Sequence, residues 1–185
     1  MKICIVSDSH DNRTLLDLAV ADAKLRGAEA VLHCGDVVAP TTLRVLQKHE
    51  LPVHVIHGNN TGDLVNTVKL ASEPQSVIHF YGQDAGIEMG GRNIFIVHYP
   101  HYARAMSLTG DWDLVCCGHD HRAGIETMTT IKQTTTILVN PGTVGGVGAV
   151  PTYVFGDLSS LQFDICDVPV PESMAYNKAH VTPHT

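Results

Sequence analysis

Three apolar segments alternate with amphipathic segments over roughly the first 70 residues of this 185-residue chain. The segments with the character of buried strands are 2–7, 28–36 and 52–60. Apolar residues between and after them recur at helical spacing: Leu16, Ala19, Val20 and Ala23, then Leu43 and Leu46, then Leu64, Val65 and Val68. Because strands and helices alternate in this way, we expect a parallel sheet with helices packed on it.

The second part of the chain has a different pattern. From about residue 76 it consists of short strand-like runs, interrupted by one helical segment at about 101–109. These runs are 76–81, 85–91, 92–99, 113–119, 124–131, 133–140, 152–158 and 161–168. We expect them to form a second, largely antiparallel sheet packed on the first, with Gly90-Gly91 and Ser159-Ser160 as hairpin turns. The predicted fold is therefore an α/β sandwich of two sheets with helices outside, formed by residues 1–168 as one domain. An extended tail is expected over 169–185.

Composition excludes several classes of protein. The net charge of −7 argues against a nucleic-acid binder, which needs a basic face. No apolar run approaches the ~20 residues of a membrane helix, and the N-terminus lacks a signal-peptide pattern. The five cysteines lie in strand-like runs and fit no disulfide framework, so we expect buried thiols and a cytoplasmic location.

Residue types that bind metals follow five of the predicted strands. The carboxyl ends of parallel strands are where open α/β sheets bind ligands. Polar residues after a strand have two interpretations here. They form an ordinary polar turn, or they form a binding site that requires these side chains. The residues concerned are Asp8, His10, Asp36, Asn59, His98, His119 and His121.

The spacing of these residues favours a metal site. Residues two apart in an extended chain point the same way, so Asp8 and His10 converge, as do His119 and His121. Seven donors with Asp36 shared would give each of two ions four protein ligands. Oxygen and nitrogen donors without thiolate suit Mn²⁺, Fe, Zn²⁺ or Mg²⁺. A two-metal site of this kind is suited to in-line displacement at phosphorus.

The motifs DSH, GD, GNN, VHYP and GHDH occur in the order typical of calcineurin-like metallophosphoesterases, which the chain therefore resembles over about residues 1–168. The segment NPGT at 140–143 is similar to one in that family's small YfcE/MJ0936-like branch. The resemblance implies a four-layer αββα sandwich of two mixed sheets. It also implies two divalent ions, Mn first, with Fe, Zn, Ni or Mg as alternatives. By resemblance, the first ion is held by Asp8, His10, Asp36 and His121, and the second by Asp36, Asn59, His98 and His119.

The same resemblance implies a phosphoesterase in which a metal-bridging hydroxide attacks a small phosphate ester, with Asp36, Asn59 and His98 as catalytic residues. Many family members have a histidine acid after the Asn of the GN motif, where this chain has Asn60. An amide cannot protonate a leaving group at neutral pH, so good leaving groups and phosphodiesters are favoured. Small-branch members typically show His-Gly-His where this chain has His98-Tyr99-Pro100-His101. Asn60, His101 and Arg13 are the candidate substrate contacts.

Other interpretations stay open at this point. A relative of the small branch, the retromer scaffold subunit, serves in protein assembly, so a non-catalytic interaction scaffold is the alternative function. The oligomeric state is also open, with a homodimer among the options. Asp11 and Asn12 are expected to cap the first helix. The strand residues His33, His54 and His79 are expected to be hydrogen-bonded structural residues.

Overall fold

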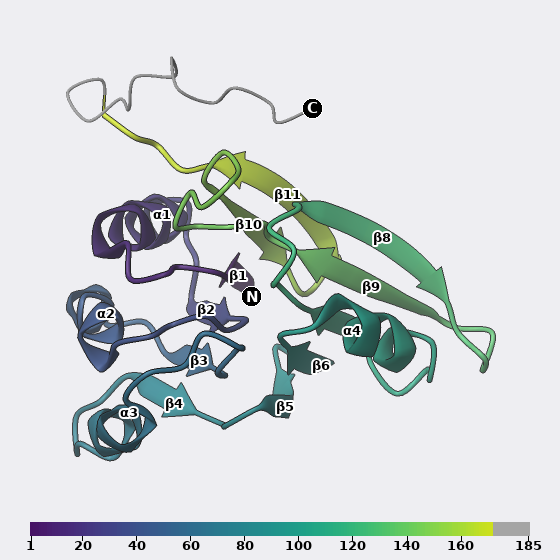
Figure 1. The fold of residues 1–185 in the computed structure, drawn as a ribbon. Helices are drawn as coiled ribbons and strands as arrows, with labels where there is room; N and C mark the ends of the chain where they lie inside the picture. Colours follow the sequence, from purple (N-terminus) through teal and green to yellow (C-terminus); the bar gives the residue numbers. More distant parts are fainter. Residues whose placement is uncertain (172–185) are drawn as a thin grey trace, which may run out of the picture.

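Two β-sheets packed face to face form the centre of the computed structural model, which describes residues 1–171. Figure 1 shows helices on both outer sides of this pair of sheets. The first sheet has the order β11-β10-β1-β2-β3-β4 and the second β5-β6-β7-β9-β8. Strands of the first sheet are β1 (Lys2–Val6), β2 (Ala30–His33), β3 (Val53–Val55), β4 (Ile78–Phe80), β10 (Thr152–Asp157) and β11 (Gln162–Asp167). Strands of the second are β5 (Asp84–Met89), β6 (Arg92–Val97), β7 (Leu114–Cys116), β8 (Gly124–Thr129) and β9 (Thr135–Asn140).

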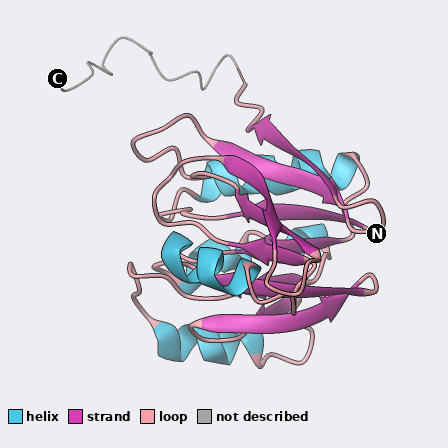
Figure 2. Ribbon diagram, turned by 90° about the vertical axis from the view of Figure 1, so that its right-hand side faces the viewer, coloured by secondary structure: helices cyan, strands magenta, loops and turns pink. Residues whose placement is uncertain are grey.

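Helices complete the four layers that the sequence predicts. Helix α4 packs against β6, β7 and β9 of the second sheet, and Figure 2 shows it in front of these strands. The remaining helices cover the outer face of the first sheet (Figure 1). The helical elements are α1 (Arg13–Leu25), α2 (Pro40–Arg44), the 3-10 helix Gln47–His49, α3 (Leu64–Ala71) and α4 (Pro100–Ser107).

Apolar side chains fill the spaces between the layers. Ile3, Ile5 and Leu32 of the first sheet pack with Ile94 and others of the second sheet in the core between the two. A separate cluster joins the first sheet to its helices. The chain ends α1 with Gly27 at φ 95, which only glycine adopts readily, as its position predicts. Helix α3 forms where expected, yet it buries Thr67 and Leu70 and leaves Val65 and Val68 exposed.

The parallel arrangement of the first strands is confirmed. β1, β2, β3 and β4 pair parallel, with Ile3 opposite Ala30 and Leu32 opposite His54. Parallel strands connected by helices have their carboxyl ends at one edge of the sheet. In the second sheet, β6 and β7 are also parallel neighbours, so the loops that follow them begin at one edge as well.

The predicted division of strands between the two sheets is wrong for three runs. The run at 76–81 joins the first sheet, where β4 pairs parallel with β3. The runs at 152–158 and 161–168 also belong there, since β10 pairs antiparallel with β1 and β11 with β10. Without them, the second sheet is mixed: β6-β7 and β7-β9 are parallel, and β5-β6 and β8-β9 are antiparallel. Two mixed sheets are what the resemblance to the metallophosphoesterases implies.

Several smaller features can be compared with expectation. Gly90-Gly91 connects the antiparallel pair β5-β6, and Ser159-Ser160 connects β10-β11, as predicted. Among residues 1–171, no helix combines the length and the apolar character that crossing a membrane requires. The tail predicted from residue 169 is described only as far as residue 171, and 172–185 lie outside the described residues.

Candidate metal centre

Left-handed backbone conformation marks the loops that carry the predicted ligands. Five of the seven have positive φ: Asp8 at 53°, His10 at 41°, Asp36 at 56°, His119 at 77° and His121 at 60°. Such angles are uncommon outside glycine and cost free energy, so they persist where the surrounding structure enforces them. These turns replace the extended geometry that the spacing argument assumed. Asp8 and His10 still converge, whereas His119 and His121 contribute to different halves of the site.

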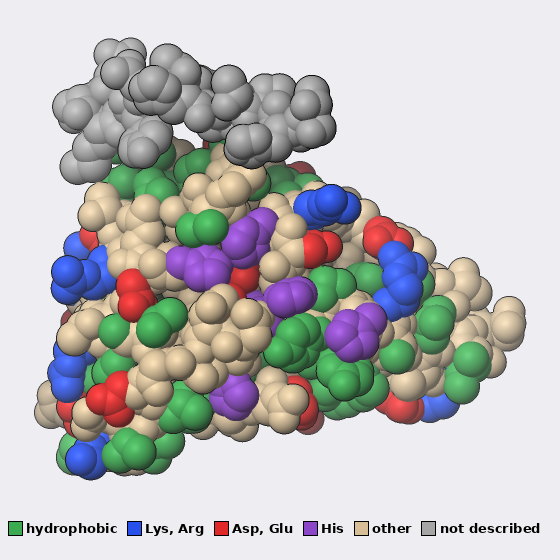
Figure 3. Space-filling model, in the orientation of Figure 1, with side chains coloured by type: hydrophobic (Ala, Val, Ile, Leu, Met, Phe, Trp, Pro, Cys, Tyr) green, Lys and Arg blue, Asp and Glu red, His purple; other side chains and the backbone are tan. Residues whose placement is uncertain are grey.

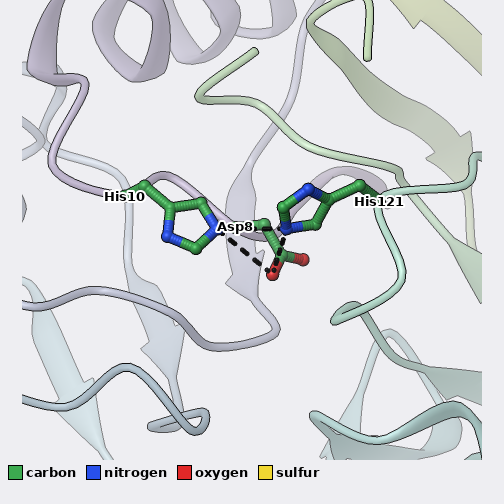
Figure 4. Close-up of side chains that lie close together, drawn as sticks. All are labelled: Asp8, His10 and His121. Atoms are coloured by element: carbon green, nitrogen blue, oxygen red, sulfur yellow. Dashed lines mark hydrogen bonds and ion pairs between the residues drawn. The ribbon is translucent and has the colours of Figure 1, made fainter. Parts of the chain in front are cut away.

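Asp8, His10 and His121 form one half of the site (Figure 4). Oδ1 of Asp8 lies 3.3 Å from Nε2 of His121 and 3.8 Å from Nε2 of His10. The two imidazole nitrogens are themselves 3.1 Å apart. Asp8 and His10 follow β1 and His121 follows β7, so the two sheets together build this half.

Asp36, Asn59, His98 and His119 form the other half. Nε2 of His98 lies 3.3 Å from Oδ1 of Asp36 and 3.0 Å from Oδ1 of Asn59. The same Asn59 oxygen lies 2.8 Å from Nδ1 of His119. Oδ2 of Asp36 is 3.8 Å from Nε2 of His10 in the first half. Asp36 therefore lies between the two halves, where the sequence predicts a shared ligand.

Backbone carbonyls orient two of the imidazoles. Nδ1 of His98 donates to the Cys34 carbonyl at 2.8 Å, and Nδ1 of His121 donates to the Val147 carbonyl at 2.7 Å. A carbonyl only accepts, so in the neutral ring the proton is on Nδ1 and the lone pair is on Nε2. Both lone pairs then face the oxygens of Asp8 or Asp36. Imidazole ligands of metals in proteins are commonly held in this way.

The surroundings of the buried Asp8 carboxylate show whether a cation fits this site. Its Oδ2 accepts the backbone N–H of His119 at 2.9 Å, while its Oδ1 is buried without a hydrogen-bond partner among the described residues. Asp8 is 0% exposed, and an unpaired buried charge is costly. A cation between this oxygen and the converging nitrogens would satisfy all of them. The donor set therefore fits a divalent metal that binds oxygen and nitrogen.

Asn60 holds Asp36 in place. Its backbone N–H donates to Oδ1 of Asp36 at 2.9 Å and its side-chain amide donates to Oδ2 at 2.6 Å. Burial opposes ionisation of Asp36, but these hydrogen bonds outweigh it and lower the pKa of its carboxyl below the usual value. The candidate substrate contact Asn60 thus touches a predicted ligand directly.

The other two candidate substrate contacts, His101 and Arg13, have no hydrogen bond, ion pair or ring contact with a predicted ligand among the described residues. The His101 ring packs against Tyr102 and Tyr99, with centroid separations of 4.2 and 5.7 Å. Arg13 is exposed at the start of α1, and no described residue pairs with its guanidinium. Figure 3 shows histidine side chains gathered near the middle of this face of the molecule, with acidic atoms visible between them.

Neighbouring polar residues differ in part from expectation. Asn12 caps α1 as predicted, because its side chain accepts the N–H of Leu15. Asp11 does not: its Oδ1 accepts from the backbone of Val38 and Ala39 and from the Thr42 hydroxyl, so it fixes the loop after β2.

Two residues of the NPGT segment support the centre, a role that sequence reasoning did not assign. The Thr143 hydroxyl donates to the Asp8 carbonyl at 2.9 Å. The Asn140 amide donates to the Gly118 carbonyl at 3.1 Å and to Asp120 at 2.7 Å. These bonds join the loop after β9 to the loops that carry Asp8 and His119. In the sequence, the NPGT motif was the only signal for these two residues.

The expected strand histidines have structural contacts, with one exception. His33 is buried beside Ser9 at 3.3 Å, and burial lowers its pKa to about 3. His54 lies 2.7 Å from the Tyr81 hydroxyl. His79 stacks on His54 with a centroid separation of 5.0 Å, but no hydrogen bond joins its ring to the described residues. None of these three side chains belongs to the centre.

Metal binding is expected to stabilise the protein measurably. Metal-stripped protein should gain about 2.7 kcal/mol when Mn²⁺ is added at roughly 100 times its Kd. For a chain of this size, that corresponds to a rise in Tm of about 5–10 °C. Differential scanning calorimetry with and without Mn²⁺ measures it, and Ca²⁺ at the same ionic strength controls for non-specific ion effects. An unchanged Tm together with no Mn²⁺ retained after dialysis would contradict the metal assignment.

Comparison with known proteins identifies the family. The profile of the calcineurin-like phosphoesterase superfamily domain matches residues 1–161. Phosphodiesterase MJ0936 of Methanocaldococcus jannaschii is 27% identical over 169 residues, which cover 88% of this chain and 96% of that protein. The probable metallophosphoesterase YsnB of Bacillus subtilis is 27% identical over 146 residues, covering 78% of this chain and 75% of that protein.

Solved structures share the fold. An archaeal phosphodiesterase superposes with a TM-score of 0.78 at 24% identity, covering 90% of this chain and 99% of its own. YfcE, a phosphoesterase from E. coli, superposes with a TM-score of 0.61 at 16% identity, covering 91% and 100%. The family profile spans most of the chain, and MJ0936 and YfcE represent the branch that the motifs predict. This chain therefore belongs to the calcineurin-like phosphoesterase superfamily.

Proposed function

We propose that this protein is a binuclear metal-dependent phosphoesterase that hydrolyses small phosphodiesters in preference to monoesters. One observation carries the proposal: the unpartnered, buried Oδ1 of Asp8 faces imidazole nitrogens from loops of both sheets. Membership of the superfamily and the similarity to a phosphodiesterase support the reaction type.

The ligands divide into two sets that share Asp36. We assign Asp8, His10, Asp36 and His121 to the first ion and Asp36, Asn59, His98 and His119 to the second. Mn²⁺ is the ion we expect, and Fe, Zn²⁺, Ni²⁺ and Mg²⁺ also suit these donors. Two bound divalent ions would supply a nucleophilic hydroxide and Lewis acidity, leaving about one excess positive charge over Asp8, Asp36 and that hydroxide.

The chain's own residues position the reacting groups. Asn60 holds Asp36 ionised between the two ligand sets, while the Cys34 and Val147 carbonyls fix the rings of His98 and His121. Oδ1 of Asn59 lies 3.0 Å from the unprotonated Nε2 of His98 and 2.8 Å from Nδ1 of His119, so these atoms converge where the second ion would bind. The centre of the proposed catalytic machinery is therefore formed by Asp36, Asn59 and His98. Each of these residues lies within 3.8 Å of two other predicted ligands.

Protonation of the leaving group sets the substrate preference. Asn60 occupies the position where many relatives have an acidic histidine, and its amide donates to Asp36 instead. An amide does not release a proton at neutral pH, so esters whose leaving groups need little protonation react best. A phosphodiester with a good leaving group satisfies this condition, and it carries a single charge to neutralise.

Hydrolysis of bis(4-nitrophenyl) phosphate is expected after Mn²⁺ is restored to metal-stripped protein, at a kcat/KM above that for 4-nitrophenyl phosphate. Release of 4-nitrophenol measures both reactions, and EDTA should abolish them. Matched assays with Zn²⁺, Ni²⁺ and Mg²⁺ rank the metals. Binding of two ions without turnover of either ester would refute the proposed activity and favour the scaffold alternative.

We also propose a cytoplasmic setting and a small-molecule substrate. The five cysteines form no disulfide and four are buried, which suits a reducing compartment. The net charge of −7 disfavours a nucleic-acid partner.

A further inference from the structure

A group of aromatic side chains lies beside the second ligand set. Tyr99 directly follows the ligand His98, and its ring meets two ligand rings edge-on. The centroid separations are 5.3 Å to His98 and 5.0 Å to His119, with interplanar angles of 71° and 65°. This position places an aromatic ring in direct contact with the predicted metal ligands.

Two further rings extend this group away from the centre. Tyr102 lies 6.0 Å from Tyr99, and His101 lies 4.2 Å from Tyr102. Tyr99 caps α4 at its N-terminus and Pro100 begins the helix, so residues 101 and 102 lie in its first turn. We call Tyr99, His101 and Tyr102 the aromatic wall.

The two outer members of the aromatic wall are open to solvent, whereas Tyr99 is half-buried beside the ligands. Tyr102 is 52% exposed and His101 is also exposed. Within residues 1–171, no hydrogen bond involves the two tyrosine hydroxyls or the His101 ring. Exposed rings gain most when a planar apolar group covers them, and ligand sites are commonly lined in this way.

The charged residues of α4 indicate which kind of ligand group the aromatic wall can bind. Arg104 is the only Lys, Arg, Asp or Glu residue of α4, and both oxygens of Glu126 pair with it at 2.8 Å. Helix α4 therefore has no unpaired cation that could bind a second phosphate or a carboxylate. An uncharged ring is the complementary group.

We propose that the aromatic wall selects phosphate esters that carry a planar ring, either an aryl group or a nucleobase, and stacks that ring beside the second ligand set. This inference rests on the proposed function for the location of the phosphate. Tyr102 is the residue best suited to test it, because its ring contacts Tyr99 and His101 and no predicted ligand.

Calorimetric titration of the Mn²⁺-loaded full chain with phenyl phosphate and methyl phosphate tests the proposal through binding, with phosphate release measured in parallel so that any heat of hydrolysis is subtracted. These probes have the same phosphate group, so the ratio of their Kd values isolates the ring. We expect phenyl phosphate to bind about three- to tenfold more tightly than methyl phosphate. Adenosine 5′-monophosphate forms a third arm: tighter binding than phenyl phosphate identifies a nucleoside ester, and weaker binding identifies an aryl ester.

Variants separate stacking from structural damage. The phenyl-to-methyl preference should fall toward one in Tyr102→Leu and return in Tyr102→Phe. Tyr81→Leu is the matched control, since Tyr81 is a similarly exposed tyrosine at the end of β4 and outside the centre. Equal binding of the two probes by the parent protein, or an unchanged ratio in Tyr102→Leu, would overturn the aromatic wall. A ring preference without ester hydrolysis would instead refute only the catalytic proposal.

Discussion

Replacing Asp36 with alanine is expected to lower kcat/KM for bis(4-nitrophenyl) phosphate by more than about 100-fold. Changes in groups that merely support metal ligands typically cost about 10–100-fold, and Asp36 is proposed here as a ligand shared by both ions. One of its oxygens lies 3.3 Å from Nε2 of His98 and the other lies 3.8 Å from Nε2 of His10. Its loss therefore removes a donor from both ligand sets at once.

The metal content of Asp36→Ala decides whether its loss of activity results from the loss of a ligand that both ions share. We expect elemental analysis after dialysis to show less than the two Mn²⁺ per chain proposed for the parent protein. Asp164→Ala removes an exposed carboxylate of β11 and serves as the matched control, with parent-like metal content and activity. Full Mn²⁺-dependent turnover by Asp36→Ala would be incompatible with a shared ligand.

The parallel half of the fold could be predicted because its signals are local. Apolar runs separated by helical periodicity require a parallel sheet, and parallel strands bring their carboxyl ends together. That rule brings together Asp8, Asp36 and Asn59, which follow β1, β2 and β3 of one sheet. The approach of Asp8 to His121 joins two different sheets and does not follow from it. Residue types and strand order thus predicted that the candidate side chains after the parallel strands would lie at one edge of the sheet.

Strand partners in the second half could not be predicted in the same way. The runs that became β4, β10 and β11 are short and strand-like, as are those of the second sheet. What distinguishes them is a distant partner: β10 pairs with β1 across about 150 residues of sequence. Periodicity reports which face of a strand is buried and does not name the neighbouring strand.

The support of the candidate site was also largely invisible in the sequence. The Cys34 and Val147 carbonyls that orient His98 and His121 are backbone atoms, so no residue type signals them. Asp11 has a φ of 60° and holds the loop after β2, which a helix-cap pattern does not reveal. Motifs predict the groups that bind, whereas the groups that orient them depend on loop geometry.

Gly58→Ala tests how closely the loops must approach one another. A Cβ at position 58 would collide with Oδ1 of Asp36, and it would lie 2.7 Å from Nε2 of His98 and 2.8 Å from the Asp36 backbone nitrogen. The backbone atom cannot rotate away, so the loops that carry two proposed ligands must separate. A shift of about 1 Å in a catalytic group can cost about 100-fold in rate. We expect a loss of kcat/KM of at least about that size.

The same collision is expected to reduce stability by only about 1–3 kcal/mol, the usual cost of overpacking. This corresponds to a fall in Tm of about 3–10 °C, so the variant remains folded at room temperature. Gly124→Ala is the matched control, because nothing lies within 4 Å of a Cβ at that position. Calorimetry on both variants measures the loss of stability, and the diester assay on both measures the loss of activity. Parent-like activity in Gly58→Ala would show that Asp36 and His98 need not lie this close, and would count against their sharing one metal centre.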